Sequence, residues 1–252
     1  MTLRLPDFII GGAPRSGTTW LYYLLDRHPQ IAMAKPPRPE PKFFLVDELY
    51  RQGVEYYSKR WFEGIPAGKM AGEKSTNYLE DAAVAERIRA AVPRAKLIFI
   101  LRNPVDRAYS NYRWSRMNGM ESEEFAAALA LESERERNLS PQLRFSRPHA
   151  YFSRGLYADH LQRFFSAFPR EQVLVLRLED CVTDGPGAAK QVHRFLGVAP
   201  RPGDATGDLE RNEADGEGDV PEAIRAELAA RYAEPNRRLA ALLGWPEDPW
   251  RT

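Results

Sequence analysis

The segment FIIGGAPRSGTTWLYYLL, residues 8–25, constrains the fold of this 252-residue chain more than any other. It begins with a short apolar run, passes through a turn that contains three glycines, and continues from Thr18 with the apolar spacing of an amphipathic helix. A buried strand that runs through a glycine-rich turn into a helix is a common unit of parallel α/β sheets. The segment therefore predicts an α/β fold whose first strand and first helix meet at a tight turn.

Apolar runs and amphipathic stretches alternate along the rest of the chain. After the first strand at 8–10, we expect strands at 31–34, 70–72, 97–101 and 173–178, and the last two, LIFIL and VLVLRL, are typical of strands covered on both faces. We expect helices at 18–27, 54–62, 81–91, 104–117, 122–137, 156–168, 188–196 and 221–243. This order predicts a three-layer, doubly wound, mostly parallel sheet in a single domain over residues 1–252.

Two segments interrupt the alternation. Residues 36–41, PPRPEP, contain too much proline for a helix or a central strand and predict a stiff extended loop. Residues 199–220 are rich in Gly, Pro, Asp and Glu and predict a long surface loop. That loop has two interpretations, a lid over a site and a disordered insertion.

Charge and composition exclude several classes of protein. A net charge of +1 provides no global field for nucleic acid or for an anionic membrane. No stretch approaches the ~20 apolar residues of a membrane-spanning helix, and the N-terminus does not resemble a signal peptide. The single cysteine, Cys181, excludes a disulfide within the chain and is typical of a reducing compartment. We expect a cytoplasmic protein that binds neither nucleic acid nor membranes; its oligomeric state is not indicated.

The glycine turn has the composition of an anion-binding loop. Gly11, Gly12 and Gly17 let the backbone turn tightly, so that several amides and the positive end of the following helix point to one place. The alternative is an ordinary connection between a strand and a helix. Arg15 within the turn, together with a Ser-Gly-Thr-Thr helix start, favours the anion site.

The turn differs from a loop that binds ATP with magnesium. Such a loop has a lysine before its Ser or Thr, and an acidic residue usually ends a neighbouring strand. Here Thr18 and Thr19 occupy the end of the loop, and Arg102 ends the strand LIFIL. Glu179 and Asp180 follow the last strand and are the best argument for a metal, but a structural role where a helix begins is favoured. We therefore expect a phosphate held by amides and arginines, with no metal.

A second basic motif follows the strand LIFIL. The sequence LRNPVDRAYSNY places Arg102 at the carboxyl end of that strand and Pro104 at the first position of a helix. Ser110 lies about two turns into this helix, on about the same face as Asn103 and Trp114. Arg102 and Ser110 can therefore converge on a second phosphate beside the first.

With both motifs in place, the chain resembles the sulfotransferases that use 3′-phosphoadenosine 5′-phosphosulfate (PAPS). PRSGTTW, residues 14–20, is similar to the family's 5′-phosphosulfate loop, and LRNPVDRAYSNY, residues 101–112, is similar to its 3′-phosphate motif. EKSTNYL at 73–79, residues 154–180 and VHRFLGV at 192–198 add to the resemblance. It implies the P-loop-like sulfotransferase fold and transfer of a sulfuryl group from PAPS to a hydroxyl of a small-molecule or saccharide acceptor. The product would be 3′,5′-adenosine bisphosphate (PAP).

The resemblance also assigns residues to the two ends of the nucleotide. Arg15 takes the place of the loop's usual lysine, and Arg102 with Ser110 would hold the 3′-phosphate. The remaining residues assigned to the 5′ end are Ser16, Gly17, Thr18, Thr19 and Trp20. One departure concerns the basic stretch that closes over the nucleotide in the family. The corresponding residues 199–220 are mostly acidic here, with Arg211 and Asn212 as the plausible donors.

The general base implied by the resemblance is a glutamate in a motif like Glu-x-x-Phe-Phe. EPKFF, residues 40–44, lies at that place, so Glu40 is the predicted base; the alternative is a solvated loop charge. Lys74 is a second candidate for the catalytic site, with a surface salt bridge to Glu73 as its alternative. Among the histidines, only His149 is kept as an alternative base or acceptor contact.

Two rival functions are compatible with this set of motifs. A metal-dependent kinase on the same sheet is disfavoured by the missing loop lysine and the missing acid at the strand end. A non-catalytic nucleotide-binding protein is the other rival, because the acidic late segment is compatible with binding without efficient turnover.

Overall fold

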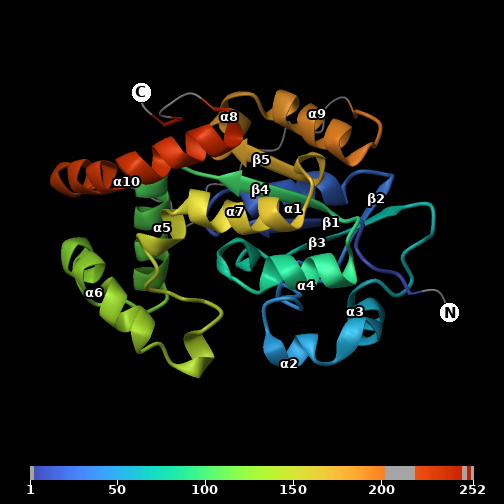
Figure 1. Ribbon diagram of the computed structural model, residues 1–252, viewed down its shortest axis with the longest axis horizontal. Helices are drawn as coiled ribbons and strands as arrows, with labels where there is room; N and C mark the ends of the chain where they lie inside the picture. The colour runs from blue at the N-terminus through green and yellow to red at the C-terminus, as the bar shows by residue number, and fades with distance from the viewer. Residues whose placement is uncertain (1–2, 202–218, 246–248, 251–252) are drawn as a thin grey trace. The chain divides into compact units, whose positions relative to one another are not determined.

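A computed structural model describes residues 3–201, 219–245 and 249–250 of the chain. The chain divides into two compact units, of which the first comprises Met1–Leu101 and Arg163–Glu210. The second comprises Arg102–Gln162 and Arg211–Thr252. Figure 1 labels the helices and strands of both. The single sulfotransferase domain expected over residues 1–252 stays a prediction.

The first unit contains a parallel five-stranded sheet with the strand order β2-β3-β1-β4-β5 (Figure 1). The strands are β1 (Phe8–Gly12), β2 (Ile31–Met33), β3 (Met70–Lys74), β4 (Lys96–Leu101) and β5 (Val173–Arg177). All five lie where the sequence predicts them, and the α/β fold with a doubly wound parallel sheet is confirmed. Parallel strands end at the same edge, so the loops after β1 and β3, which are neighbours in the sheet, lie together.

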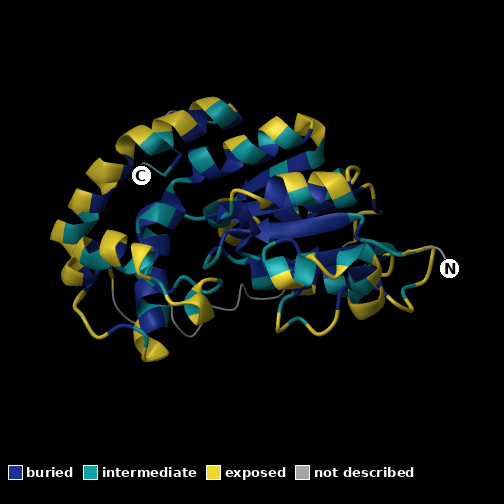
Figure 2. Cartoon of the chain, turned by 60° about the horizontal axis from the view of Figure 1, so that its bottom comes forward, coloured by how far each residue is buried: buried dark blue, intermediate teal, exposed yellow. Residues whose placement is uncertain are grey.

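Helices cover both faces of this sheet. On one face, a buried apolar cluster joins Phe8 and Ile10 of β1 and Ile98 of β4 to α1 (Thr18–Asp26) and α9 (Gly185–Leu196). On the other, Phe99 contacts Phe164 of α7 (Tyr157–Ala167) with 4.8 Å between the ring centroids. Figure 2 shows the central strands of the sheet as mostly buried, and β1 is buried at all five of its residues. The unit also contains α2 (Asp47–Tyr50), α3 (Gly53–Trp61), α4 (Val84–Ala91), α8 (Leu178–Thr183) and the 3₁₀ helices η1 (Tyr78–Glu80) and η4 (Arg170–Gln172).

The second unit is built from helices. Its elements are α5 (Pro104–Met117), α6 (Phe125–Arg137), α10 (Glu222–Leu243), the 3₁₀ helices η2 (Pro141–Leu143) and η3 (Ser153–Gly155), and the first part of α7. Its core contains apolar and aromatic side chains from α5, α6 and α10, among them Ala108, Tyr112, Phe125, Leu228 and Tyr232. No helix within the described ranges combines the length and the apolar character needed to cross a bilayer.

Local polar chemistry explains where helices begin later than expected. The carboxylate of Asp81 accepts a hydrogen bond from the amide of Ala83 at 2.9 Å, so the chain turns there and α4 begins at Val84. Glu121 likewise accepts from the amides of Ser122 and Glu123, so α6 begins at Phe125 and not at 122.

Three other expectations about segments have different outcomes. The Pro-rich segment 36–41 is not extended as expected, because the chain bends at residues 37–39. The short helix α8 was not predicted: its first residue, Leu178, was expected to end the last strand, and no element was expected over the residues that follow. Most of the expected loop at 199–220, including the candidate donors Arg211 and Asn212, lies outside the described residues.

Candidate active site

The loop after β1 forms the tight turn that its glycines predict. Gly12 has φ of +153°, and a Cβ atom there would come within 2.9 Å of the Thr76 carbonyl oxygen and of Leu79 Cβ. Gly17 has φ of +82° and caps α1 with a left-handed backbone conformation. Arg15 also has a positive φ, 66°, which is uncommon for a residue with a side chain. Such backbone conformations persist where the surrounding structure requires them, frequently at functional sites.

The start of α1 has the features of an anion site. No side chain caps the helix, and its first turn contains no acidic residue, so the positive end of the helix dipole is not countered by an acidic side chain of its own first turn. Ser16 is fully buried and Thr18 is 5% exposed, whereas Arg15, Thr19 and Trp20 are half-buried. The residues of this loop therefore fit a phosphate or a phosphosulfate bound by backbone amides.

A carboxylate cluster lies at the end of β3. Lys74 Nζ is 2.6 Å from Glu40 Oε1, and the backbone amide of Thr76 donates to Glu40 Oε2 at 3.1 Å. The Thr76 hydroxyl lies 3.2 and 3.3 Å from the two carboxylate oxygens. The Lys74 and Glu40 side chains are only 4% and 12% exposed. Glu40 is thus no solvated loop charge, and Lys74 pairs with Glu40 in the interior instead of with Glu73 at the surface.

The cluster adjoins the loop after β1. The strands β1 and β3 are neighbours, with Ile10 opposite Lys74, and the Ser75 amide donates to the Ile10 carbonyl at 3.0 Å. The close approach of Gly12 to the Thr76 carbonyl then brings the glycine turn against the residue that binds Glu40. A candidate base, a lysine and an anion loop therefore share one edge of the sheet in the first unit.

Sequence reasoning missed Thr76 as a partner of Glu40. Thr76 belongs to EKSTNYL, the same motif that contains Lys74. Thr76 lies two residues after Lys74, in the turn that follows β3, and its place in the same motif was the available signal. That Glu40 is the partner of Lys74 and Thr76 could not be predicted in this way, because no periodic pattern in the sequence determines the path of the 36–41 loop.

The second phosphate motif belongs to the second unit. Asn103 caps α5, where its side-chain oxygen accepts from the amide of Val105 at 3.0 Å, and Pro104 occupies the first turn as expected. Ser110 is 3% exposed, and Arg102 is half-buried. The carbonyl of Arg102 accepts from the Tyr157 hydroxyl at 2.9 Å, which fixes the backbone before the helix.

The other candidate residues have structural contacts. His149 lies 3.4 Å from the Tyr151 hydroxyl, and burial lowers its pKa, with a further lowering by Arg135. The exposed Asp180 forms two hydrogen bonds with Arg177 at the start of α8. Burial raises the pKa of Cys181 to about 12, so the thiol stays protonated. Within the described ranges, no group of three or more His, Cys, Asp and Glu side chains is arranged to hold a metal ion.

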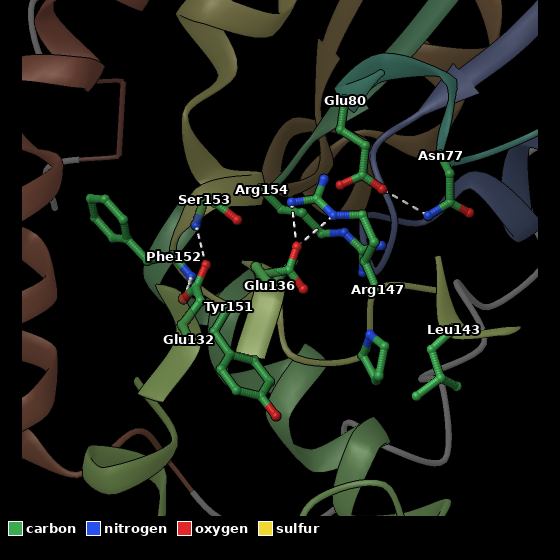
Figure 3. Close-up of polar contacts among 12 residues, drawn as sticks. Asn77, Glu80, Glu132, Glu136, Leu143, Arg147, Tyr151, Phe152, Ser153 and Arg154 are labelled. Atoms are coloured by element: carbon green, nitrogen blue, oxygen red, sulfur yellow. Dashed lines mark hydrogen bonds and ion pairs between the residues drawn. The ribbon is translucent and has the colours of Figure 1, made fainter. Parts of the chain in front are cut away.

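Carboxylates also order the loops of the second unit, as Figure 3 shows. Glu132 accepts from the backbone amides of Phe152 and Ser153 at 2.6 and 2.8 Å. Arg147, whose φ is 41°, donates to Glu136 at 2.6 Å. These bonds fix the segment that contains His149.

A parallel α/β sheet with a glycine turn after its first strand and an uncapped helix behind it defines the class of nucleotide-binding proteins with a P-loop-like fold. Residues 5–212 match the sulfotransferase domain family, and the chain therefore belongs to the sulfotransferases, a family of enzymes that transfer sulfate from PAPS.

Relatives and solved structures agree with this assignment. The chain is 30% identical over 213 residues to human bifunctional heparan sulfate N-deacetylase/N-sulfotransferase 2, covering 78% of this chain and 22% of that protein. It is 34% identical over 208 residues to human bifunctional heparan sulfate N-deacetylase/N-sulfotransferase 3, covering 78% of this chain and 23% of that protein. The chain thus spans under a quarter of the length of these relatives. A sulfotransferase from Alicyclobacillus acidocaldarius has a TM-score of 0.81 at 31% identity, covering 96% of this chain and 97% of that chain.

A mouse sulfotransferase complexed with PAP has a TM-score of 0.61 at 19% identity, covering 96% of this chain and 88% of that chain. At this level of identity the likeness concerns the fold. The P-loop-like sulfotransferase fold expected from the sequence is confirmed by these comparisons.

Proposed function

We propose that this chain transfers the sulfuryl group of PAPS to a hydroxyl of a small-molecule or saccharide acceptor, with Glu40 as the general base. The observation that carries the proposal is the Glu40, Lys74 and Thr76 cluster at the end of β3, directly beside the glycine turn that follows β1. A base must lie next to the group that is transferred, and this edge brings a buried carboxylate to an anion-binding loop.

On the donor side, the loop at residues 14–20 is proposed to hold the 5′ end of the nucleotide. The amides at the start of α1 and the guanidinium of Arg15 would counter the negative charge that develops on the departing 5′-phosphate. Arg102 and Ser110 are proposed to hold the 3′-phosphate, on the strength of their motif and of the family. PAPS supplies an activated sulfuryl group, and fixed cations and amides suit its modest charge without a metal.

On the acceptor side, Glu40 would accept the proton of the attacking hydroxyl while the acceptor oxygen forms its bond to sulfur. The bond between sulfur and the bridging phosphate oxygen breaks in the same step, and PAP leaves with that electron pair. Lys74, which lies 2.6 Å from the carboxylate, would face the sulfuryl oxygens and counter their charge. The backbone amide of Thr76 keeps Glu40 oriented throughout.

The proposal is tested by following sulfate transfer from PAPS, in the presence of EDTA, to a panel of hydroxylated small molecules, saccharides and an amino sugar. We expect transfer by the wild type, and a loss of about 10²- to 10⁴-fold in kcat for Glu40→Gln. The matched control is Glu48→Gln, which changes an exposed carboxylate on the neighbouring helix α2. Its kcat should equal that of the wild type.

Two results would overturn the proposal. The first is a wild type that transfers no sulfate but phosphorylates an acceptor from ATP and Mg²⁺, which identifies the rival kinase. The second is a Glu40→Gln variant as active as Glu48→Gln, which removes the base assignment. A product that carries sulfate only on the nitrogen of the amino sugar, with none on a hydroxyl of the panel, would replace the hydroxyl acceptor with an amine.

A further inference from the structure

A second carboxylate lies in the interior behind the candidate base. Glu73 of β3 is fully buried, so it cannot touch a substrate. The Tyr57 hydroxyl donates to Glu73 Oε1 at 2.7 Å, and the Ser75 hydroxyl donates to Oε2 at 2.9 Å. The Tyr78 hydroxyl lies close enough to act on this carboxyl group, and it lowers the pKa of Glu73. Three hydroxyl groups from α3, β3's end and η1 therefore converge on one buried acid.

Two of these hydroxyls also bind the loop that contains Glu40. The backbone amide of Lys42 donates to Ser75 Oγ at 2.9 Å, and the amide of Phe44 donates to the Tyr78 hydroxyl oxygen at 3.2 Å. A hydroxyl has one proton and two lone pairs. Because the Ser75 proton is donated to Glu73, its lone pairs are available to the Lys42 amide. The amides can only donate, and the carboxylate takes the Ser75 proton, so the Ser75 oxygen stays an acceptor for the loop.

The loop backbone requires this support. Lys42 has φ of 49°, in the left-handed region that a residue with a side chain rarely adopts. Its carbonyl accepts from the amides of Leu45 and Val46 at 3.1 and 3.0 Å, so the turn is closed at Lys42. Glu40 precedes this turn by two residues, and any relaxation of Lys42 would move the carboxylate away from Lys74 and Thr76.

We propose that Glu73 is a positioning residue for the base: through the hydroxyls of Ser75 and Tyr78 it fixes the backbone at Lys42 and Phe44, and thereby the carboxylate of Glu40. The proposal rests on the proposed function only in naming Glu40 as the base. Glu73 itself takes no part in the transfer and contacts neither donor nor acceptor.

The energetics of a buried acid agree with a role that demands charge. The pKa of Glu73 is raised to about 7, because burial and, to a smaller extent, the charge of Glu40 raise it by more than the hydroxyls of Tyr57, Ser75 and Tyr78 lower it. If the only role of Glu73 were to accept hydrogen bonds from buried hydroxyls, a neutral acceptor could do the same without the free-energy cost of burying a carboxylate. The hydrogen-bond donors instead stabilise the ionised form, the form that orients all three hydroxyls toward itself.

The first test measures amide hydrogen exchange in the ligand-free protein and does not depend on activity. In Glu73→Gln, the side-chain NH₂ must donate to one of the hydroxyls. It thereby reverses one of the hydrogen bonds that the hydroxyls donate to Glu73 in the wild type. We expect the amides of Lys42 and Phe44 to exchange about tenfold faster than in the wild type, while the amides of β1 and β4 keep their rates. The matched control is Glu86→Gln, an exposed carboxylate on α4 with a 68% exposed side chain.

Ser75→Ala tests the same hydrogen bonds at the residue that lies between Glu73 and the Lys42 amide. It removes the hydroxyl that joins Glu73 to the Lys42 amide and leaves the Glu73 side chain in place, so Lys42 should again exchange faster. It also replaces Glu73→Gln as the deciding variant if that protein does not fold. The inference is overturned if the amides of Lys42 and Phe44 exchange at wild-type rates in the variants that fold.

The second test separates positioning from general stability. Glu73→Gln should lower kcat by about 10- to 100-fold. It should leave the affinity for PAP within about twofold, because the loop after β1 takes no part in the hydrogen bonds that run from Glu73 to the Glu40 loop. In a Glu40→Gln background the same substitution should cause no further loss of kcat. An equal loss in both backgrounds would contradict the inference. If the wild type transfers no sulfate, the proposed function fails, and the exchange measurement alone decides the role of Glu73.

Discussion

Ionisation of Glu73 makes the stability of the folded protein depend on pH. The group is fully buried, and burial raises its pKa from an ordinary value of 4.5 to about 7. The folded protein therefore holds this proton more tightly than the unfolded chain does. The stability that Glu73 contributes is fully present below pH 4.5 and is lost as the pH rises through about 7.

The size of this effect follows from the two pKa values. The difference between 4.5 and about 7 corresponds to about 3 kcal/mol of unfolding free energy, at about 1.4 kcal/mol for each tenfold change in proton binding. About 2.5 kcal/mol of it should be lost between about pH 5 and about pH 8. Tyr57 donates to the carboxylate, so Tyr57→Phe should shift the loss to a higher pH.

The assay is urea unfolding of the wild type and of Glu73→Gln across this pH range. Because glutamine does not titrate, the unfolding free energy of the wild type should fall relative to that of the variant as the pH rises. The groups that act on Glu73 are Tyr57, Tyr78, Ser75 and Glu40, and all of them are present in both proteins. A difference that stays constant, or that grows with pH, would refute the reasoning.

Three further perturbations have defined outcomes. Lys74→Ala leaves the largely buried Glu40 carboxylate without its cation, so it should cost about 2 kcal/mol in urea unfolding and lower kcat; unchanged stability would argue against the buried pair. Gly12→Ala brings a Cβ within 2.9 Å of a backbone oxygen and should cost about 1–3 kcal/mol and weaken PAP binding. Gly64→Ala shares the strain of a positive φ but meets nothing within 4 Å, so it should cost about 1 kcal/mol and leave PAP binding unchanged. Cys181 should resist a thiol reagent until urea unfolds the protein, because its pKa is about 12; rapid labelling of the folded protein would contradict this.

The parts of the fold that were predictable are those with a strong local pattern. The strands were found because a strand covered on both faces is apolar throughout, and α5 was placed correctly because Pro104 marks its first turn. The starts of α4 and α6 were not found, because Asp81 and Glu121 bind nearby backbone amides and hold a turn before each helix. These local side-chain hydrogen bonds are not reported by hydropathy.

The candidate site shows the same division. Its loop, its lysine and Glu40 were predicted from motifs and stay predictions as site residues, whereas the contacts of Glu40 were not predicted. Glu40 pairs with Lys74 and Thr76 because the Pro-rich segment bends, and a bend between prolines does not follow from composition. Glu73 was assigned only a surface salt bridge, because a buried acid and an exposed acid are identical in sequence. Its burial depends on Tyr57, which approaches from a different element.

The proposed function requires that one nucleotide is bound through arginines and amides without a metal. Isothermal titration calorimetry of PAP in the presence of EDTA, with wild type, Arg15→Ala, Arg102→Ala and Glu48→Gln, tests this claim. We predict binding that EDTA does not change, a loss of about tenfold or more in affinity for each arginine variant, and no change for Glu48→Gln. Binding of PAP that requires Mg²⁺, tighter binding of ATP with Mg²⁺, or unchanged affinity in both arginine variants would contradict it.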